Sequence, residues 1–303
     1  MTIALIIVGL ALLTFPGWLD RGHRLGPAQL ARIGRASLTL GFVGVIGGLV
    51  LWGVPAILHW ADSLGIPGLC DAAVHRLPFG GLELAVPMAT IATVVISRAI
   101  TAAGHARISA QRARVDPGFG RHLRMGDYDV VVIPSPKLVA VGVPGDEPQI
   151  VLSQGLVAEL TSFELDAVIR HEVAHHRLRH RRYLVTAAVV DQVIGWLPPV
   201  RSSARSLRNA VEEWADLEST GASETRVATL RSALRRLASR RTTTTERASI
   251  ERRIAILDSN RRAARPGPWR SVLSWVPAGA LSLIGGGAFV LVVQSTNAII
   301  RCA

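Results

Sequence analysis

The chain contains 303 residues, of which 49% are hydrophobic, and its mean hydropathy is +0.34. These values exceed those of ordinary soluble domains and predict a mainly helical integral membrane protein with several spans. The formal net charge of +12 suits contact with anionic lipid headgroups. Direct binding of nucleic acid is not expected, because no recognition motif accompanies the basic residues.

Four apolar runs are the predicted membrane spans. The runs carry no charged residue and lie at Thr2–Leu19, Ser37–Leu58, Leu84–Ser97 and Val272–Ile300. The third run is short, but it reaches span length if its charged flanking residues extend to the two interfaces. The first run lacks a basic leading segment and a clear cleavage site, so no removable signal peptide is expected. About four transmembrane helices are predicted, three within residues 1–104 and one within residues 271–303.

The distribution of arginine predicts the orientation of these spans in the cell membrane. The linker between the first and second runs contains Arg21, Arg24, Arg32 and Arg35, whereas the loop after the second run contains only Arg76. By the positive-inside rule the linker is cytoplasmic and that loop is external. We therefore expect external termini and a cytoplasmic domain over residues 105–270. Cys70 and Cys302 would both lie outside, either as a disulfide or as two unpaired cysteines.

Three short segments rich in β-branched residues follow the third span. Tyr128–Pro134, Leu138–Val143 and Ile150–Ser153 are separated by proline and glycine turns, which predicts a small antiparallel sheet. An exposed edge strand can pair with an extended peptide backbone, and Val139–Val143 is the candidate for this role. The alternative is that this segment forms an ordinary packed hairpin.

A His-Glu-Val-Ala-His run at residues 171–175 is the main candidate for chemistry. Thr161-Ser162-Phe163-Glu164 has the capping-box form, so the run falls in the middle of a helix that begins two to three turns earlier. Residues four apart share one helix face, so His171 and His175 can offer two imidazole nitrogens to one metal ion. Glu172 then lies beside the open metal position, where a general base activates water.

A catalytic zinc site also needs a third protein ligand and one open position. The long metzincin motif is excluded, because leucine and arginine stand where that motif has glycine and a third histidine. Glu212 and Asp216 are four apart on a later predicted helix and share one face. We expect Glu212 to bind the metal and Asp216 to accept the distal N–H of His171. Glu213 points about 100° away and is expected to be solvated or salt-bridged.

Other polar residues near the motif have less defined roles. His176 points away from the ligand face and is expected to support the site or to lie at an interface rather than to bind metal. His180 is four residues from His176, but we find no carboxylate for a second metal site. The sequence does not identify the donor that stabilises the oxyanion of the reaction, for which His176, Arg208 and Asn209 are candidates.

The apolar segment Tyr183–Val200 follows the motif helix directly. A complete membrane crossing here would separate the three metal ligands, so we interpret it as a re-entrant or interfacial hairpin, broken near Asp191 and Gln192 and ended by Pro198-Pro199. A buried helix of the catalytic domain is the alternative. Two amphipathic helices follow, separated by an exposed loop at Arg240–Glu246. Their apolar positions are Val227, Leu230, Leu234 and Leu237 in the first, and Ile250, Ile254 and Leu257 in the second.

From Tyr128 to Asp216 the chain resembles the catalytic region of the BlaR/MecR membrane metallopeptidases, the antirepressors of β-lactam resistance. The matching features are the three β-rich segments, Gly155-Leu156, Glu164-Leu165, the run 171–175 and Glu212-Glu213-Trp214-Ala215-Asp216. The HtpX-like membrane proteases share the metal motif and the Glu-x-x-Ala-Asp form. The resemblance implies an α+β gluzincin-type peptidase domain with His171, His175 and Glu212 as Zn2+ ligands and Glu172 as the base.

The BlaR/MecR resemblance also implies a protease that cleaves a transcriptional repressor in the cytoplasm. Only a few residues follow Ile300, and no Ser-x-x-Lys motif of a penicillin-binding sensor lies outside. Direct sensing of β-lactams is therefore not expected, and a separate sensor partner or the loop His59–Gly81 would supply the signal. The alternatives are an HtpX-like protease for quality control of membrane proteins and a non-catalytic membrane scaffold. The expected partners are a protein or peptide substrate and the lipid bilayer.

Overall fold

Three long apolar helices form the N-terminal part of the computed structural model, which describes residues 2–21, 25–63, 81–112, 120–125, 128–143, 149–240 and 244–258. These helices are α1 (Thr2–Arg21), α2 (Pro27–Ser63) and α4 (Gly81–Arg112). Each contains a stretch long and apolar enough to cross a membrane, at Ile3–Asp20, Pro27–Gly53 and Val86–His105. The first three predicted spans are therefore confirmed as candidate membrane helices. The fourth predicted span, Cys70 and Cys302 lie outside the described residues.

Small residues let α1 approach its neighbours closely. A Cβ atom on Gly9 would lie 2.8 Å from the carbonyl oxygen of Gly41, and one on Gly41 would lie 2.6 Å from that of Gly9. α1 also crosses α8 (Pro198–Thr220), where the backbone N–H of Gly17 donates a 3.0 Å hydrogen bond to Ser203 Oγ. Such contacts are typical of helix packing in membranes. α1 is thus packed against both α2 and α8.

Two arginines that we expected in the first linker lie inside α2 instead. This helix begins at Pro27, so Arg32 and Arg35 are in its first turns. The guanidinium carbon of Arg32 lies 5.2 Å from the ring centre of Trp214, and that of Arg35 lies 5.3 Å from the ring centre of Tyr183. Cation–π contacts at these distances are favourable. The start of α2 therefore packs on later helices of the chain.

The sheet contains four strands in the order β1-β2-β4-β3. They are β1 (Arg121–Met125), β2 (Tyr128–Ile133), β3 (Ala140–Val143) and β4 (Gln149–Ser153). β1 and β3 are antiparallel to their neighbours, whereas β2 and β4 are parallel. The prediction of a purely antiparallel sheet is wrong at this central pair, because β3 lies on the far side of β4 and leaves β4 beside β2. β1 was not predicted, since it contains no β-branched residue.

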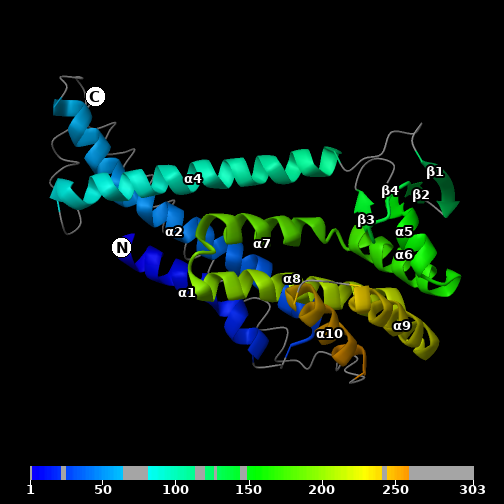
Figure 1. Cartoon of the computed structure of the whole chain (residues 1–303). Coiled ribbons are helices and arrows are strands. Elements are labelled where there is room, and N and C mark those ends of the chain that lie inside the picture. The colour runs from blue at the N-terminus through cyan, green and yellow to red at the C-terminus, as the bar shows by residue number, and fades with distance from the viewer. Residues whose placement is uncertain are drawn as a thin grey trace.

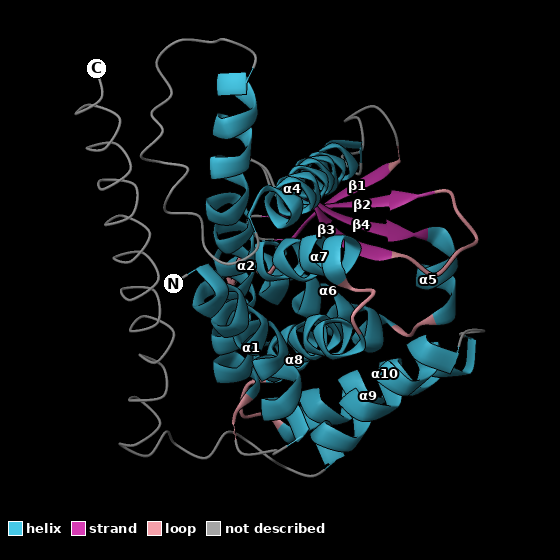
Figure 2. Ribbon diagram, turned by 90° about the vertical axis from the view of Figure 1, so that its left-hand side faces the viewer, coloured by secondary structure: helices cyan, strands magenta, loops and turns pink. Residues whose placement is uncertain are grey.

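Helices cover the sheet and connect it to the membrane helices (Figures 1 and 2). The remaining helices are α5 (Gln154–Glu159), α6 (Ser162–Arg177), α7 (Arg181–Ile194), α9 (Glu224–Arg240) and α10 (Thr244–Asp258). Ile150 of the sheet and Ile169 of α6 share one buried apolar cluster. A second cluster joins Leu13 of α1, Leu38 of α2 and Leu207 of α8. The membrane helices and the sheet-bearing part are therefore linked through α6, α7 and α8.

α7 and α8 form a helical hairpin that lies beside α4 (Figure 1). Helix α7 continues through Asp191 and Gln192, so the break predicted there is wrong, and the turn lies at residues 195–197 instead. The helix accommodates Asp191 because the carboxylate pairs with Arg208 of α8, Oδ2 to Nη2, at 2.8 Å. At the turn the side chain of Trp196 is 70% exposed. That this segment is re-entrant or lies at the membrane interface stays a prediction.

The two amphipathic helices predicted near the end of the described chain are confirmed as α9 and α10. Leu230 and Leu234 of α9 and Ile250 and Leu257 of α10 are buried in one cluster. The predicted loop at 240–246 is shorter than expected, because α9 extends to Arg240 and α10 begins at Thr244.

Candidate metal centre

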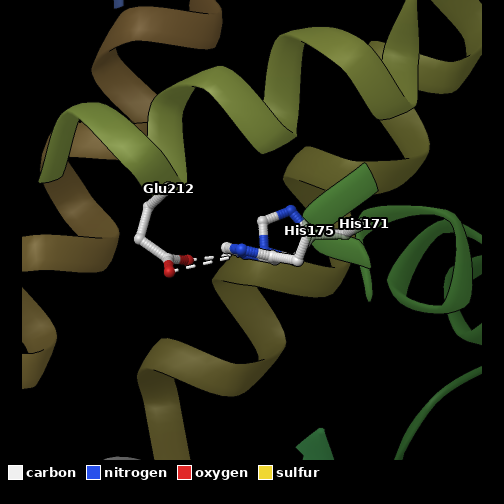
Figure 3. A group of neighbouring side chains, drawn as sticks. All are labelled: His171, His175 and Glu212. Atoms are coloured by element: carbon white, nitrogen blue, oxygen red, sulfur yellow. Dashed lines mark hydrogen bonds and ion pairs between the residues drawn. The ribbon is translucent and has the colours of Figure 1, made fainter. Parts of the chain in front are cut away.

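Three ligand atoms from α6 and α8 converge, as Figure 3 shows. The Nε2 atoms of His171 and His175 are 3.0 Å apart. Glu212 Oε2 lies 3.4 Å from His171 Nε2, and Glu212 Oε1 lies 3.5 Å from His175 Nε2. In a tetrahedral zinc site with bonds of about 2.1 Å, two ligand atoms are roughly 3.4 Å apart. The two carboxylate–imidazole distances match this value, and the two imidazole nitrogens need to move apart by only about 0.4 Å to hold a zinc ion. His171, His175 and Glu212 together are the donor group.

The start of α6 is fixed by its own sequence. The hydroxyl of Thr161 accepts a hydrogen bond from the backbone N–H of Glu164, and the Glu164 carboxylate accepts one from the backbone N–H of Thr161. This reciprocal capping box confirms the predicted helix start. The two histidines are therefore one helical turn apart on a helix whose register is set locally, with His171 more deeply buried than His175.

Glu172 faces the edge strand of the sheet. Its Oε2 atom accepts a 2.9 Å hydrogen bond from the backbone N–H of Gly142 on β3. β3 pairs with β4 on one side only, and among the described residues no strand pairs with its other edge. The Glu172 carboxylate thus lies beside an edge strand, and Val141 on that strand is exposed.

A buried ion pair supports His171 from behind. The Nδ1 atom of His171 lies 2.9 Å from Asp216 Oδ1, on the ring side opposite the metal-facing Nε2. Asp216 accepts two hydrogen bonds from Arg253 of α10, at 2.7 Å from Nε and 2.6 Å from Nη2. Arg253 Nη1 also lies 3.2 Å from Glu212 Oε2. Arg253 was not predicted, because nothing in the local sequence distinguishes it among the 34 lysine and arginine residues.

His180 supports His175 in a comparable way. Its Nδ1 atom lies 3.1 Å from His175 Nδ1, and its ring packs on Trp214 with centroids 4.8 Å apart. The end of α6 brings this about, because Arg179 adopts a left-handed conformation with φ of 53°. The N–H of His180 then bonds back to the carbonyl of His175, and that of Arg179 to the carbonyl of His176. This is the Schellman pattern of helix termination, and it turns His180 toward His175.

Two carboxyl groups at the site have lowered pKa values. Burial raises the pKa of Glu212, but hydrogen bonds from His171 and His175 outweigh it and hold that pKa well below its usual range. Burial likewise opposes ionisation of Asp216, yet the charge of Arg253 keeps the pKa of this carboxyl low. Both carboxylates are therefore ionised at neutral pH.

His171 and His180 differ in protonation. Burial lowers the pKa of His171, but hydrogen bonds to Asp216 and Glu212 more than compensate and raise it to about 9. Burial and the neighbouring His175 lower the pKa of His180 to about 3, so this ring is neutral. A neutral His180 can accept the Nδ1–H of His175, which leaves His175 Nε2 free as a ligand atom.

Other predicted site residues lie elsewhere. His176 packs edge-on against Tyr128 with ring centroids 5.7 Å apart, so it supports the sheet rather than the donor group. Arg208 pairs with Asp191 in the α7–α8 hairpin. Glu213 was expected to be solvated or salt-bridged; it is buried and pairs with Arg252 Nε at 2.7 Å.

The comparisons with known proteins agree with this geometry. Residues 104–242 match the model of Peptidase family M48. The match includes the sheet, the donor residues of α6 and α8, and α9. Comparison with the curated proteins gives no match, and comparison with the solved structures gives none either. The family match supports a metallopeptidase. Residues 104–242 are therefore similar to peptidases of family M48, and three candidate membrane helices precede most of this segment.

Proposed function

We propose that this chain is a membrane-embedded zinc endopeptidase in which His171, His175 and Glu212 hold the zinc ion. The observation that carries the proposal is the spacing of the three donor residues, which lies within about 0.4 Å of the edges of a tetrahedral zinc site. Two nitrogens and one carboxylate oxygen are also the donor set of catalytic zinc sites that keep one position open for water. When bound, zinc supplies a Lewis acid that acidifies water and polarises the peptide carbonyl.

Glu172 is the general base of this proposal. Its carboxylate takes a proton from the attacking water and returns it to the amine that leaves. The hydrogen bond from the Gly142 N–H to Oε2 orients the group and leaves Oε1 available for the proton. Asp216 keeps a proton on His171 Nδ1, and a bound metal would replace the proton that Nε2 carries at neutral pH.

The outer edge of β3 is the proposed binding surface for the substrate backbone. An extended peptide can add to a free strand edge by main-chain hydrogen bonds. A peptide on β3 would lie next to Glu172, because Gly142 of β3 is hydrogen-bonded to the Glu172 carboxylate. The substrate class is therefore a protein or peptide in an extended conformation.

We place the peptidase domain at the cytoplasmic face of the cell membrane, as the positive-inside rule predicts. A reporter enzyme that is active only in the cytoplasm, fused after residue 258, tests this placement. Reporter activity is expected from that fusion, and activity only from a fusion to the N-terminus would contradict the orientation.

The physiological role that we propose is regulatory cleavage of a transcriptional repressor, as the BlaR/MecR resemblance implies. A quality-control protease for membrane proteins is the second candidate, and the packing of α8 directly on α1 and α2 favours it because membrane-embedded substrates could reach the site. A Glu172→Gln variant used as a substrate trap separates the two. A captured soluble repressor supports the first role, and captured membrane proteins support the second.

The catalytic proposal itself is tested with the purified full chain. We expect Glu172→Gln to keep stoichiometric zinc and to lose peptide cleavage, because the base is removed while the ligands remain. Asp166→Asn is the matched control, since Asp166 is an acidic residue on the same helix that pairs only locally with Arg170. Full cleavage by Glu172→Gln would refute the assigned base. Absence of bound zinc from the wild-type chain would favour a non-catalytic scaffold.

A further inference from the structure

Two adjacent arginines on α10, Arg252 and Arg253, reach two different parts of the molecule. α10 lies beyond the segment that matches the family, which ends at residue 242. Neighbouring residues on a helix point about 100° apart. As a result, Arg253 faces the donor group, whereas Arg252 faces the end of α1.

Arg253 contacts both Glu212 and Asp216, the residue that supports His171. Its side chain is only 14% exposed, and it makes the two hydrogen bonds to Asp216 and the 3.2 Å contact with Glu212 Oε2. This contact fixes one oxygen of the Glu212 carboxylate and leaves Oε1 on the side of His175. Removing Arg253 would leave the carboxylate of Asp216 buried without its charge partner, which is costly.

Arg252 ties the same turn of α10 to the first membrane helix. Its Nη2 and Nη1 atoms donate to Asp20 Oδ1 at 2.6 Å and to Oδ2 at 3.1 Å. Its Nε atom donates to Glu213 at 2.7 Å. Asp20 is the last residue but one of α1. Two adjacent acids of α8, Glu212 and Glu213, are thus matched by two adjacent arginines of α10, and Arg252 also holds α1.

We propose that Arg253 is a positioning residue of the metal centre and that the Arg252–Asp20 pair holds it in place, so that the end of α1 sets the geometry of the zinc ligands. The inference rests on the proposed function, because it takes His171 and Glu212 as zinc ligands. Arg253 acts through Asp216, which orients His171, and through Glu212 directly. A shift at the end of α1 would move Arg252 and its neighbour Arg253, and would thereby change the affinity of the site for zinc.

The affinity of the full chain for zinc, measured in detergent micelles by competition with a chromogenic chelator, tests this coupling. Loss of a group that orients a metal ligand typically weakens metal binding about 10–100-fold, and we expect such a loss in Arg253→Gln. Asp20→Asn and Arg252→Gln should weaken zinc binding in the same direction but less strongly, and Arg252→Lys should restore part of the loss. Thermal unfolding without metal checks that each variant is folded.

Another ion pair of α10 provides the matched control. Arg231 of α9 and Asp258 of α10 pair at 2.7 Å and hold α10 on α9 without contacting the donor group. Asp258→Asn should therefore leave the zinc affinity unchanged. An equal loss in Asp258→Asn would overturn the proposal, because it would show that any loosening of α10 has the same effect.

A double variant separates direct from transmitted effects. If Asp20 acts through Arg252 and Arg253, then Asp20→Asn should have no further effect on zinc affinity in the Arg253→Gln background. Additive losses, or an unchanged affinity in Asp20→Asn and Arg252→Gln, would overturn the coupling. The zinc readout does not depend on cleavage. A chain that binds zinc with this coupling but cleaves no peptide would contradict the proposed endopeptidase and leave the coupling standing.

Discussion

His180 is the residue on which we expect the orientation of His175 to depend. Because His175 Nε2 belongs to the donor group, its Nδ1 needs a partner, and His180 Nδ1 lies 3.1 Å away. Loss of such a partner typically weakens metal binding about 10–100-fold, so we expect His180→Ala to lower the zinc affinity by that factor. His176→Ala is the control, since that ring packs on Tyr128. Equal losses in both variants would contradict the role of His180.

Glu164, at the start of α6, is expected to make the stability of the fold depend on pH. Burial raises the pKa of this carboxyl, but hydrogen bonds from Ser232 and Thr161 outweigh it and lower the pKa below its ordinary value of 4.5. A group with a lowered folded-state pKa stabilises the fold above its unfolded-state pKa, and this contribution is lost as the pH falls through the folded-state value. Glu164→Gln should therefore cost about 1–3 kcal/mol of unfolding free energy at neutral pH.

Thermal unfolding of Glu164→Gln across the pH range checks this sign. The difference between wild type and variant should be constant at neutral pH and should shrink as the pH falls below about 4. Glu218→Gln, at an exposed position of α8, is the control and should behave as wild type. A difference that grows in acid would show that the sign is wrong.

Local spacing in the sequence made the donor group predictable, whereas the residues that reach it through long-range contacts could not be predicted. His171 and His175 are four apart, as are Glu212 and Asp216, so each pair could be placed on one helix face before any fold was known. Arg253 follows Asp216 by 37 residues, and only the packing of α10 brings the two together. The contact of His180 with His175 was not predicted, because it depends on the left-handed Arg179, where glycine is the usual residue.

The packing of α1 on α2 offers a test at the scale of elements. Gly41→Val should cost about 1–3 kcal/mol of stability, because a Cβ atom there meets the backbone of α1 and overpacking of this kind forces helices apart. Gly47→Val is the matched control on the same helix, since a Cβ atom at Gly47 has no neighbour within 4 Å. The midpoint of thermal unfolding in micelles should fall for Gly41→Val alone. Similar midpoints for the two variants would contradict the close crossing.

Elements that follow from local pattern were predicted better than those that depend on neighbours. The capping box of α6 and the apolar stripes of α9 and α10 were confirmed, because each is encoded within a few turns. The parallel pairing of β2 and β4 depends on which side of β4 is occupied by β3, and strand composition does not determine that. The predicted break at Asp191 failed for a related reason, since its partner Arg208 lies on another helix.

At the scale of the molecule, two membrane helices contact residues that support the metal centre. α2 places Arg32 over Trp214, which packs on His180, the partner of His175. α1 places Asp20 on Arg252, next to the arginine that holds Asp216 and Glu212. The candidate membrane helices and the helices that carry the candidate metal ligands therefore form one structural unit, in which α1 and α2 contact residues that support α6 and α8.

X-ray absorption at the zinc edge of the metal-loaded full chain tests whether His171, His175 and Glu212 bind zinc. We expect one zinc per chain with only nitrogen and oxygen ligands at about 2.0–2.2 Å, two of them imidazoles. Glu212→Ala should lose one oxygen contribution and keep both imidazoles. Sulfur ligands, or a spectrum that Glu212→Ala leaves unchanged, would contradict a site built from α6 and α8.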